Sequence, residues 1–224
     1  MKRYISLLLI LILISFSLTG CYDAKSIDSF AYVIAIGIDK GTTDTLKLTF
    51  QFAIPADSSS SNGEGEGTTQ SANSSTISVQ CSSINSGLSL MNNYTSKKIN
   101  LSHCKAVIMS ETLSYDGVSD YIKTLMNNIE IRPDCNIIIS KCDASDFLHN
   151  SKPPLENLSA KYYELILNSS EYTGYSGNIT LSDFFSHMED NSGEAYAVLG
   201  SINASSVETV GTAAFRGDKL VRRA

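Results

Sequence analysis

The chain has 224 residues, of which 42% are hydrophobic and 18% are charged, and its formal net charge at pH 7 is −6. An acidic protein repels phosphate backbones, so this balance argues against nucleic acid as a partner. The length suffices for one well-filled hydrophobic core, with a second, incomplete unit at most.

The first twenty residues have the pattern of a secretory leader. Lys2 and Arg3 form a basic start, and the run from Ile5 to Leu18 is almost wholly apolar. At about 14 residues, this run is shorter than the ~20 residues that a membrane-spanning helix needs. A basic start followed by a short apolar run is typical of a secretory signal, so we expect residues 1–20 to be a signal peptide.

The leader ends in Leu18-Thr19-Gly20-Cys21, which is an apolar residue, two small residues and a cysteine. This pattern matches the bacterial lipoprotein signal, in which the cysteine thiol accepts diacylglycerol and becomes the first residue after cleavage. Each buried CH₂ of a fatty acyl chain such as palmitate gains ~0.8 kcal/mol, and stable anchoring needs more than one chain, which diacylglycerol supplies. We therefore expect lipidated Cys21 to hold the protein on the outer face of a cell membrane. An uncleaved helix with an incidental cysteine is the alternative.

Loss of the leader removes two of the 17 basic residues and leaves 15 against 23 acidic ones, a net charge of −8. The expected mature chain is therefore still more acidic.

The first two strands are predicted between residues 30 and 53. Residues 30–38 form a nearly continuous apolar run, which indicates a buried strand. Turn-forming residues follow at 39–44, and residues 46–52 then alternate between apolar and polar, which favours an antiparallel partner strand. Residues 55–75 are rich in Ser, Gly, Glu and Asn and bury too little apolar surface to offset their ordering entropy, so we expect a mobile loop there, with a domain linker as the alternative.

The centre of the chain alternates between strand and helix patterns. Apolar residues at helical spacing predict helices over 84–95 and 118–129, with Asp116 as an N-cap of the second. Strand, helix and strand with short connections form a right-handed βαβ unit. The sequence therefore predicts an α/β (mixed α+β) fold, a mixed sheet with flanking helices that is antiparallel at the first hairpin and parallel further on. The remaining strands of this region are expected at 76–79, 105–109 and 136–140.

The last part of the chain begins with two predicted helices, over 155–166 and 181–188, and Thr180 with Asp183 resembles a capping box for the second. Strand patterns follow at 195–202, 207–215 and 219–221, and the last of them has no evident sheet partner. We therefore expect residues 21–190 to form an N-terminal α/β domain and residues 191–224 to be the truncated start of a second α+β domain.

Four cysteines follow Cys21, and their spacing gives no CxxC pair. Cys135 and Cys142 bracket a predicted strand that would hold them ~23 Å apart, whereas a disulfide needs Cα atoms within ~7 Å. This pair should not bridge. Other pairings stay open, and free thiols are the favoured interpretation for Cys81, Cys104, Cys135 and Cys142.

Known catalytic patterns are missing from the sequence. The three histidines lack the spacing of metal-binding helices, and no GxSxG elbow, P-loop or dinucleotide-binding fingerprint occurs. His103 directly precedes Cys104, but neighbouring residues of a strand point to opposite faces, which argues against a nucleophile and base. We expect a protein that is not an enzyme and has no catalytic residue, metal site or cofactor.

Arg132 and His103 are the candidate partner-contact residues. Arg132 lies between a predicted helix and a buried strand, and Pro133 disfavours a helical conformation for it. Its guanidinium group has three alternatives: an ion pair with Asp134 or Asp39, capping of helix carbonyls, or contact with a partner.

Several segments, in order along the chain, resemble the Ger(x)C lipoproteins, the C subunits of nutrient germinant receptors in endospore-forming bacteria. They are Cys21 to Ile27, Ala35 to Lys40, His103 with Lys105 to Glu111, Glu130 to Pro133, and Gly211 to Val221. Tyr22 stands where tryptophan is common in the family, and Asn127 and Asn128 stand where an Arg-Asp pair is frequent. Members of the family continue past the last of these segments into a C-terminal domain.

The resemblance implies a role in spore germination without catalysis. Such proteins lie on the outer surface of the spore inner membrane and act with an A-type and a B-type integral membrane subunit in the detection of amino acids, sugars or nucleosides. A solute-binding lipoprotein of a transporter is the alternative, and it would need a two-lobed body with a cleft between the lobes.

Overall fold

The computed structural model describes residues 1–8, 26–54, 74–151, 159–168, 174, 177–190, 194–203 and 206–223. The chain divides into two compact units, Met1–Phe30 and Ala31–Ala224. In the first unit, residues 2–8 are helical and Ile27–Ser29 form a short 3₁₀ turn. The expected lipidation site Cys21 and residues 55–73 of the expected mobile loop lie outside the described residues.

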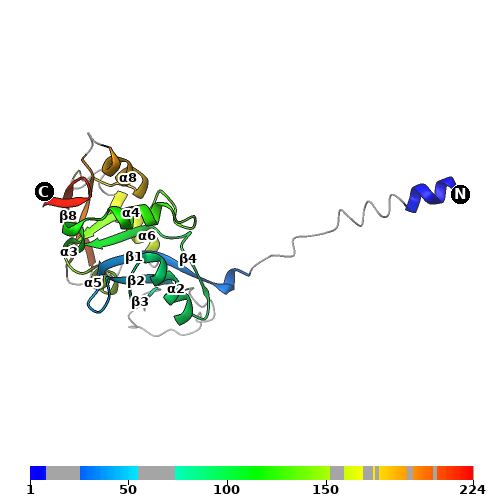
Figure 1. Ribbon diagram of the computed structural model, residues 1–224, viewed down its shortest axis with the longest axis horizontal. Coiled ribbons are helices and arrows are strands. Elements are labelled where there is room, and N and C mark those ends of the chain that lie inside the picture. The colour runs from blue at the N-terminus through cyan, green and yellow to red at the C-terminus, as the bar shows by residue number, and fades with distance from the viewer. Residues whose placement is uncertain are drawn as a thin grey trace, which may run out of the picture. The chain divides into compact units, whose positions relative to one another are not determined.

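The second unit is built on a nine-stranded mixed sheet in the order β3-β2-β1-β5-β6-β7-β8-β9, with β4 paired to β1 (Figure 1). Strands β1, β5, β6 and β7 are parallel, and antiparallel pairs extend the sheet on both sides. This confirms the predicted mixed α/β fold. The strands are β1 Phe30–Lys40, β2 Leu46–Ala53, β3 Ser74–Cys81, β4 Lys98–Asn100, β5 Ala106–Ser110, β6 Asn136–Ser140, β7 Tyr196–Asn203, β8 Ser206–Arg216 and β9 Lys219–Arg223.

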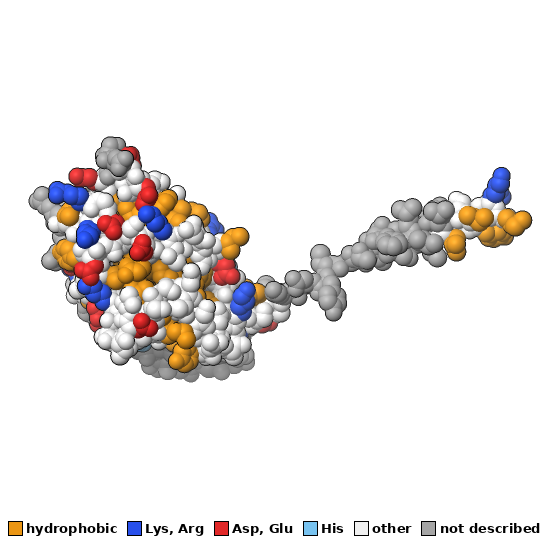
Figure 2. Space-filling view, in the orientation of Figure 1, with side chains coloured by type: hydrophobic (Ala, Val, Ile, Leu, Met, Phe, Trp, Pro, Cys, Tyr) orange, Lys and Arg blue, Asp and Glu red, His pale blue; other side chains and the backbone are white. Residues whose placement is uncertain are grey.

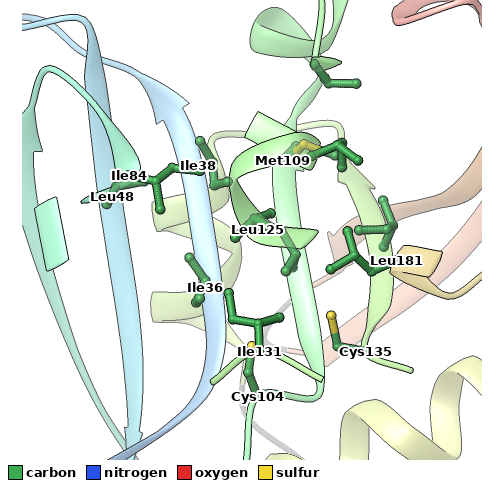
Figure 3. Packing of buried hydrophobic residues seen from close by; sticks show 14 of the residues in the cluster. Ile36, Ile38, Leu48, Ile84, Cys104, Met109, Leu125, Ile131, Cys135 and Leu181 are labelled. Atoms are coloured by element: carbon green, nitrogen blue, oxygen red, sulfur yellow. The ribbon is translucent and has the colours of Figure 1, made fainter. Parts of the chain in front are cut away.

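Helices cover both faces of the sheet because alternate residues of the central strands point to opposite sides. Val107 and Met109 of β5 join the larger apolar cluster, beneath α2, α4 and α8, whereas Ala106 and Ile108 join the smaller one, beneath α5 and α6. Figure 3 shows Leu125 of α4 lying over the sheet in the larger cluster. Within the described residues of this unit, the helices are α2 Ile84–Tyr94, α3 Glu111–Asp116, α4 Ser119–Met126, α5 Ala144–Asn150, α6 Ser159–Asn168 and α8 Leu181–Glu189.

The helix predicted over residues 118–129 differs from the observed one at both ends. Asp116 is the last residue of α3 and not an N-cap, because Gly117 adopts a φ of 124° and separates α3 from α4. The N-cap residue of α4 is Val118. At the other end, α4 stops at Met126, so the predicted apolar stripe loses its last member, Ile129.

The start of α8 confirms half of the predicted capping box. The Thr180 hydroxyl accepts a hydrogen bond from the backbone N–H of Asp183 at 3.2 Å. The Asp183 carboxylate accepts from the Thr180 hydroxyl at 2.8 Å, where a full capping box would have it accept from the Thr180 backbone N–H.

The last three strands belong to the same sheet as the rest of the body. Strand β7 pairs in parallel with β6, with Ile138 opposite Val198, and β8 and β9 follow as antiparallel neighbours. Residues 196–223, which the sequence pattern assigned to a further domain, therefore complete the sheet, and β9 has a sheet partner in β8. Among the described helices, none is both long enough and apolar enough to cross a bilayer.

Candidate interaction surface

Three segments meet at the amino ends of the parallel strands: the end of α2 with β4, the loop before β5, and the loop before β6. The Asn92 side-chain oxygen accepts from the backbone N–H of Ile99 at 2.9 Å and so ties α2 to β4. The Glu130 carboxylate accepts from the backbone N–H of Leu101 at 3.3 Å and so ties the two loops together. From their exposed side chains we select seven and name them the amino-end surface: Tyr94, Lys97, Lys98, His103, Ile129, Arg132 and Asp134.

His103 lies exposed on this surface and packs against β1. Its ring meets the ring of Tyr32 edge to face, with centroids 5.0 Å apart and planes at 87°. The neighbouring Cys104 is buried, its thiol donates to the carbonyl of Ala106 at 3.4 Å, and burial raises its pKa to about 12. Burial therefore favours the protonated thiol over the nucleophilic thiolate at neutral pH.

Arg132 is also exposed and pairs with Asp134, one of the two carboxylates that the sequence offered. Its Nε donates to one carboxylate oxygen at 2.9 Å, and its terminal nitrogen donates to the other. This double hydrogen bond raises the pKa of Arg132 and lowers the pKa of Asp134. The pairing holds the planar guanidinium at an exposed position on the surface.

The residues around Arg132 explain why it points outward. Ile131 is only 5% exposed and anchors the loop in the larger apolar cluster. The carbonyl of Arg132 accepts from Cys135, and the carbonyl of Pro133 accepts from Ser182 at the start of α8. The loop is therefore held on both sides of the arginine.

The structure adds two exposed apolar residues that the sequence analysis missed. Ile129 is fully exposed at 100%, and Tyr94 at the end of α2 is 74% exposed. Asn127 is the C-cap of α4. Because asparagine commonly ends helices, the Asn127-Asn128 pair in the sequence could have predicted that the helix stops before Ile129.

Asp39 does not pair with Arg132 and instead caps α5 at the opposite, carboxyl end of β1. Its two carboxylate oxygens accept from the backbone N–H groups of Ala144 at 2.6 Å and Ser145 at 2.9 Å. The side chain is 3% exposed, and burial raises its pKa, against the lowering effect of these N–H donors and of the Ser110 hydroxyl. The local N-cap residue of α5, Asp143, makes no side-chain capping bond. Asp39 is thus a capping group supplied from a distant strand.

Gly37 makes room for the same helix. A Cβ at this position would lie 3.0 Å from a methyl carbon of Leu148 and 3.2 Å from the Cβ of Ala144, both in α5. The Ala35 to Lys40 segment of the resemblance therefore carries two adaptations to one helix: a glycine that permits close packing and an aspartate that caps it.

Among the described residues, no group of three or more His, Cys, Asp or Glu side chains is arranged to hold a metal ion. Cys81, Cys104, Cys135 and Cys142 are all free thiols in the structure.

Comparison with known proteins gave one family and one curated relative. A family model described as "Spore germination protein N-terminal domain" matches residues 23–202. The chain is 27% identical over 229 aligned residues to "Putative spore germination protein YfkR" of Bacillus subtilis, an alignment that covers 99% of this chain and 58% of the relative. The chain thus spans little more than half of that relative's length. No solved structure matches the chain.

Proposed function

Because the chain belongs to the spore germination protein family whose N-terminal domain it matches, we propose that it is a lipid-anchored, non-enzymatic subunit of a spore nutrient germinant receptor. The observation that carries this proposal is the position of the match, which begins at residue 23, two residues after the cysteine that ends the predicted lipoprotein signal. A diacylglycerol on Cys21 would hold the protein on the outer face of the spore inner membrane.

The partners in this proposal are the A-type and B-type integral membrane subunits of the receptor. Confinement to the plane of the membrane raises the effective concentration of one subunit near another, so a modest interface suffices. Exposed His103 and Arg132, each held in place by a defined contact, are the proposed contact residues. The buried, protonated thiol of Cys104 and the structural role of Asp39 support a function without catalysis.

The architecture gives less support to a solute carrier of two lobes. Residues Ala31–Ala224 form one compact unit around one sheet, and that class of carrier needs a cleft between two lobes.

The test is germination of spores that carry Cys21→Ala in place of the native gene. Without its anchor the protein leaves the membrane, so loss of optical density after nutrient addition should slow at least about tenfold, as expected when effective concentration is lost. Spores with Cys142→Ala, which changes a half-buried thiol of the body, should respond as the wild type does. An unchanged response to amino acids, sugars and nucleosides after complete deletion of the gene would refute the proposal.

A further inference from the structure

We propose that Tyr94, Lys97, Lys98 and Ile129 of the amino-end surface rest on the headgroup region of a bilayer that contains anionic phospholipid, so that the protein has a fixed orientation on the membrane. His103 and Arg132 remain the proposed contacts to the membrane subunits. This inference rests on the proposed lipid anchor at Cys21 and goes beyond it, because an anchor alone leaves the body free to turn.

The connection of the anchor to the sheet limits which end of the body can reach the membrane. Phe30 begins β1 and lies nine residues after Cys21. A fully extended chain of this length spans at most about 30 Å. In the register of the sheet, Ala35 of β1 lies opposite Ala106, the first residue of β5, so the amino end of β5 lies about 17 Å along β1 from Phe30. Strand β1 has 11 residues, which places the carboxyl ends of the strands roughly 35 Å from Phe30. The amino-end surface is therefore the part of the sheet that the tether keeps nearest to the lipid.

The side chains of this surface suit the boundary between lipid and water. Ile129 is fully exposed, and Tyr94 presents an aromatic ring of the kind enriched at membrane interfaces. Lys97 and Lys98 are exposed beside them and would meet anionic headgroups. Figure 2 shows orange apolar side chains among charged ones on the visible face of the body.

Charge makes the orientation specific. Without its leader the chain has 15 basic and 23 acidic residues, a net charge of −8, so an anionic membrane repels the molecule as a whole. A tethered acidic body lowers its energy when it turns its exposed cations to the bilayer. The hydrogen bonds from Ile99 to Asn92 and from Leu101 to Glu130 hold the three segments in one surface, so their side chains can meet the lipid together.

The absence of tryptophan from the chain allows a direct test. The full-length lipidated protein with Ile129→Trp is reconstituted into vesicles of phosphatidylcholine and phosphatidylglycerol whose acyl chains carry bromine near the headgroup. Bromine quenches only a tryptophan that reaches the lipid, so the emission should fall about twofold or more relative to vesicles without bromine. The control is Tyr115→Trp, at an exposed position of α3 near the carboxyl end of β1. Its neighbour Asp116 pairs with Lys40, the last residue of β1. The emission of this control should stay within about a tenth of its value in vesicles without bromine.

A second pair of variants tests the role of charge. In the Ile129→Trp protein, Lys98→Glu should reduce quenching in anionic vesicles, whereas Lys141→Glu, an exposed lysine after the carboxyl end of β6, should leave it unchanged.

The outcomes separate this inference from the proposed function. If the protein does not incorporate labelled palmitate, and the Cys21→Ala variant binds membranes as well as the wild type does, the lipid anchor itself is refuted. If the protein is acylated but Ile129→Trp and Tyr115→Trp are quenched equally, the orientation is refuted. A blue shift of Ile129→Trp emission that needs the membrane subunits and occurs without bromine quenching would also overturn it, because position 129 would then contact protein and not lipid.

Discussion

At the scale of single residues, the most informative contact joins Asp39 to α5. The carboxylate comes from β1 and serves two backbone N–H groups more than a hundred positions later in the chain, at Ala144 and Ser145. Lys47 of β2 donates to the Ser145 hydroxyl at 2.8 Å and ties a second strand to the same helix start. These contacts fix α5 over the smaller apolar cluster, where Phe147 and Leu148 are buried.

Removal of this cap should destabilise the protein strongly. Asp39→Ala leaves two buried N–H donors without partners, and each costs about 1–3 kcal/mol, so the free energy of unfolding in urea should fall by about 2–6 kcal/mol. Asp39→Asn keeps one acceptor oxygen and should lose about half as much. The matched control is Asp143→Ala at the local N-cap position, which makes no capping bond and should change stability by less than about 0.5 kcal/mol. Equal losses for Asp39→Ala and Asp143→Ala would contradict the assignment.

At the scale of elements, the loop from α4 to β6 combines a buried and an exposed isoleucine two residues apart. Ile131 is inserted in the larger apolar cluster, and Ile129 points into solvent. The loop is thus anchored by one side chain and presents the other, together with Arg132, on the amino-end surface. A helix continued to residue 129 would instead have placed Ile129 on the face of Leu125, as the spacing predicted.

The two isoleucines should therefore differ sharply on truncation. Ile131→Ala removes buried methyl groups and should lower the free energy of unfolding by about 2–4 kcal/mol. Ile129→Ala should stay within about 0.5 kcal/mol of the wild type because its side chain packs against nothing that folding buries. Denaturant unfolding of both purified proteins measures the difference, and a loss above about 1 kcal/mol for Ile129→Ala would show that this side chain is buried in solution.

At the scale of the whole molecule, the three C-terminal strands complete the sheet that the earlier strands begin. Strand β7 supplies the fourth parallel strand, and Phe215 of β8 meets Phe184 of α8 edge to face with ring centroids 5.1 Å apart. The hairpin between β8 and β9 also reaches the turn between α3 and α4, where the carbonyl of Asp218 accepts from Val118 at 2.9 Å. The C-terminal strands are therefore part of the core.

A chain that ends at residue 190 should consequently fail to fold. It would expose the edge of β6 and lose the buried side chains of β7, β8 and β9, so we expect no cooperative transition in urea and weak near-ultraviolet circular dichroism. A chain that lacks residues 1–25 should keep its cooperative transition, because the compact unit begins at Ala31. Cooperative unfolding of the 21–190 fragment would establish it as a separate domain.

The sequence by itself determined the places of most strands, the mixed α/β class and the family, because these depend on local periodicity and on short segments in a fixed order. It missed α3 and α5, which are short, and α5 carries no cap of its own, since its capping carboxylate lies on β1. Only the tertiary structure decided that Asp39 belongs to α5 and not to Arg132, that Ile129 is exposed, and that residues 196–223 complete the sheet. Each of these outcomes depends on a contact between residues far apart in the chain or on where a helix ends, and local residue patterns carry little information about either.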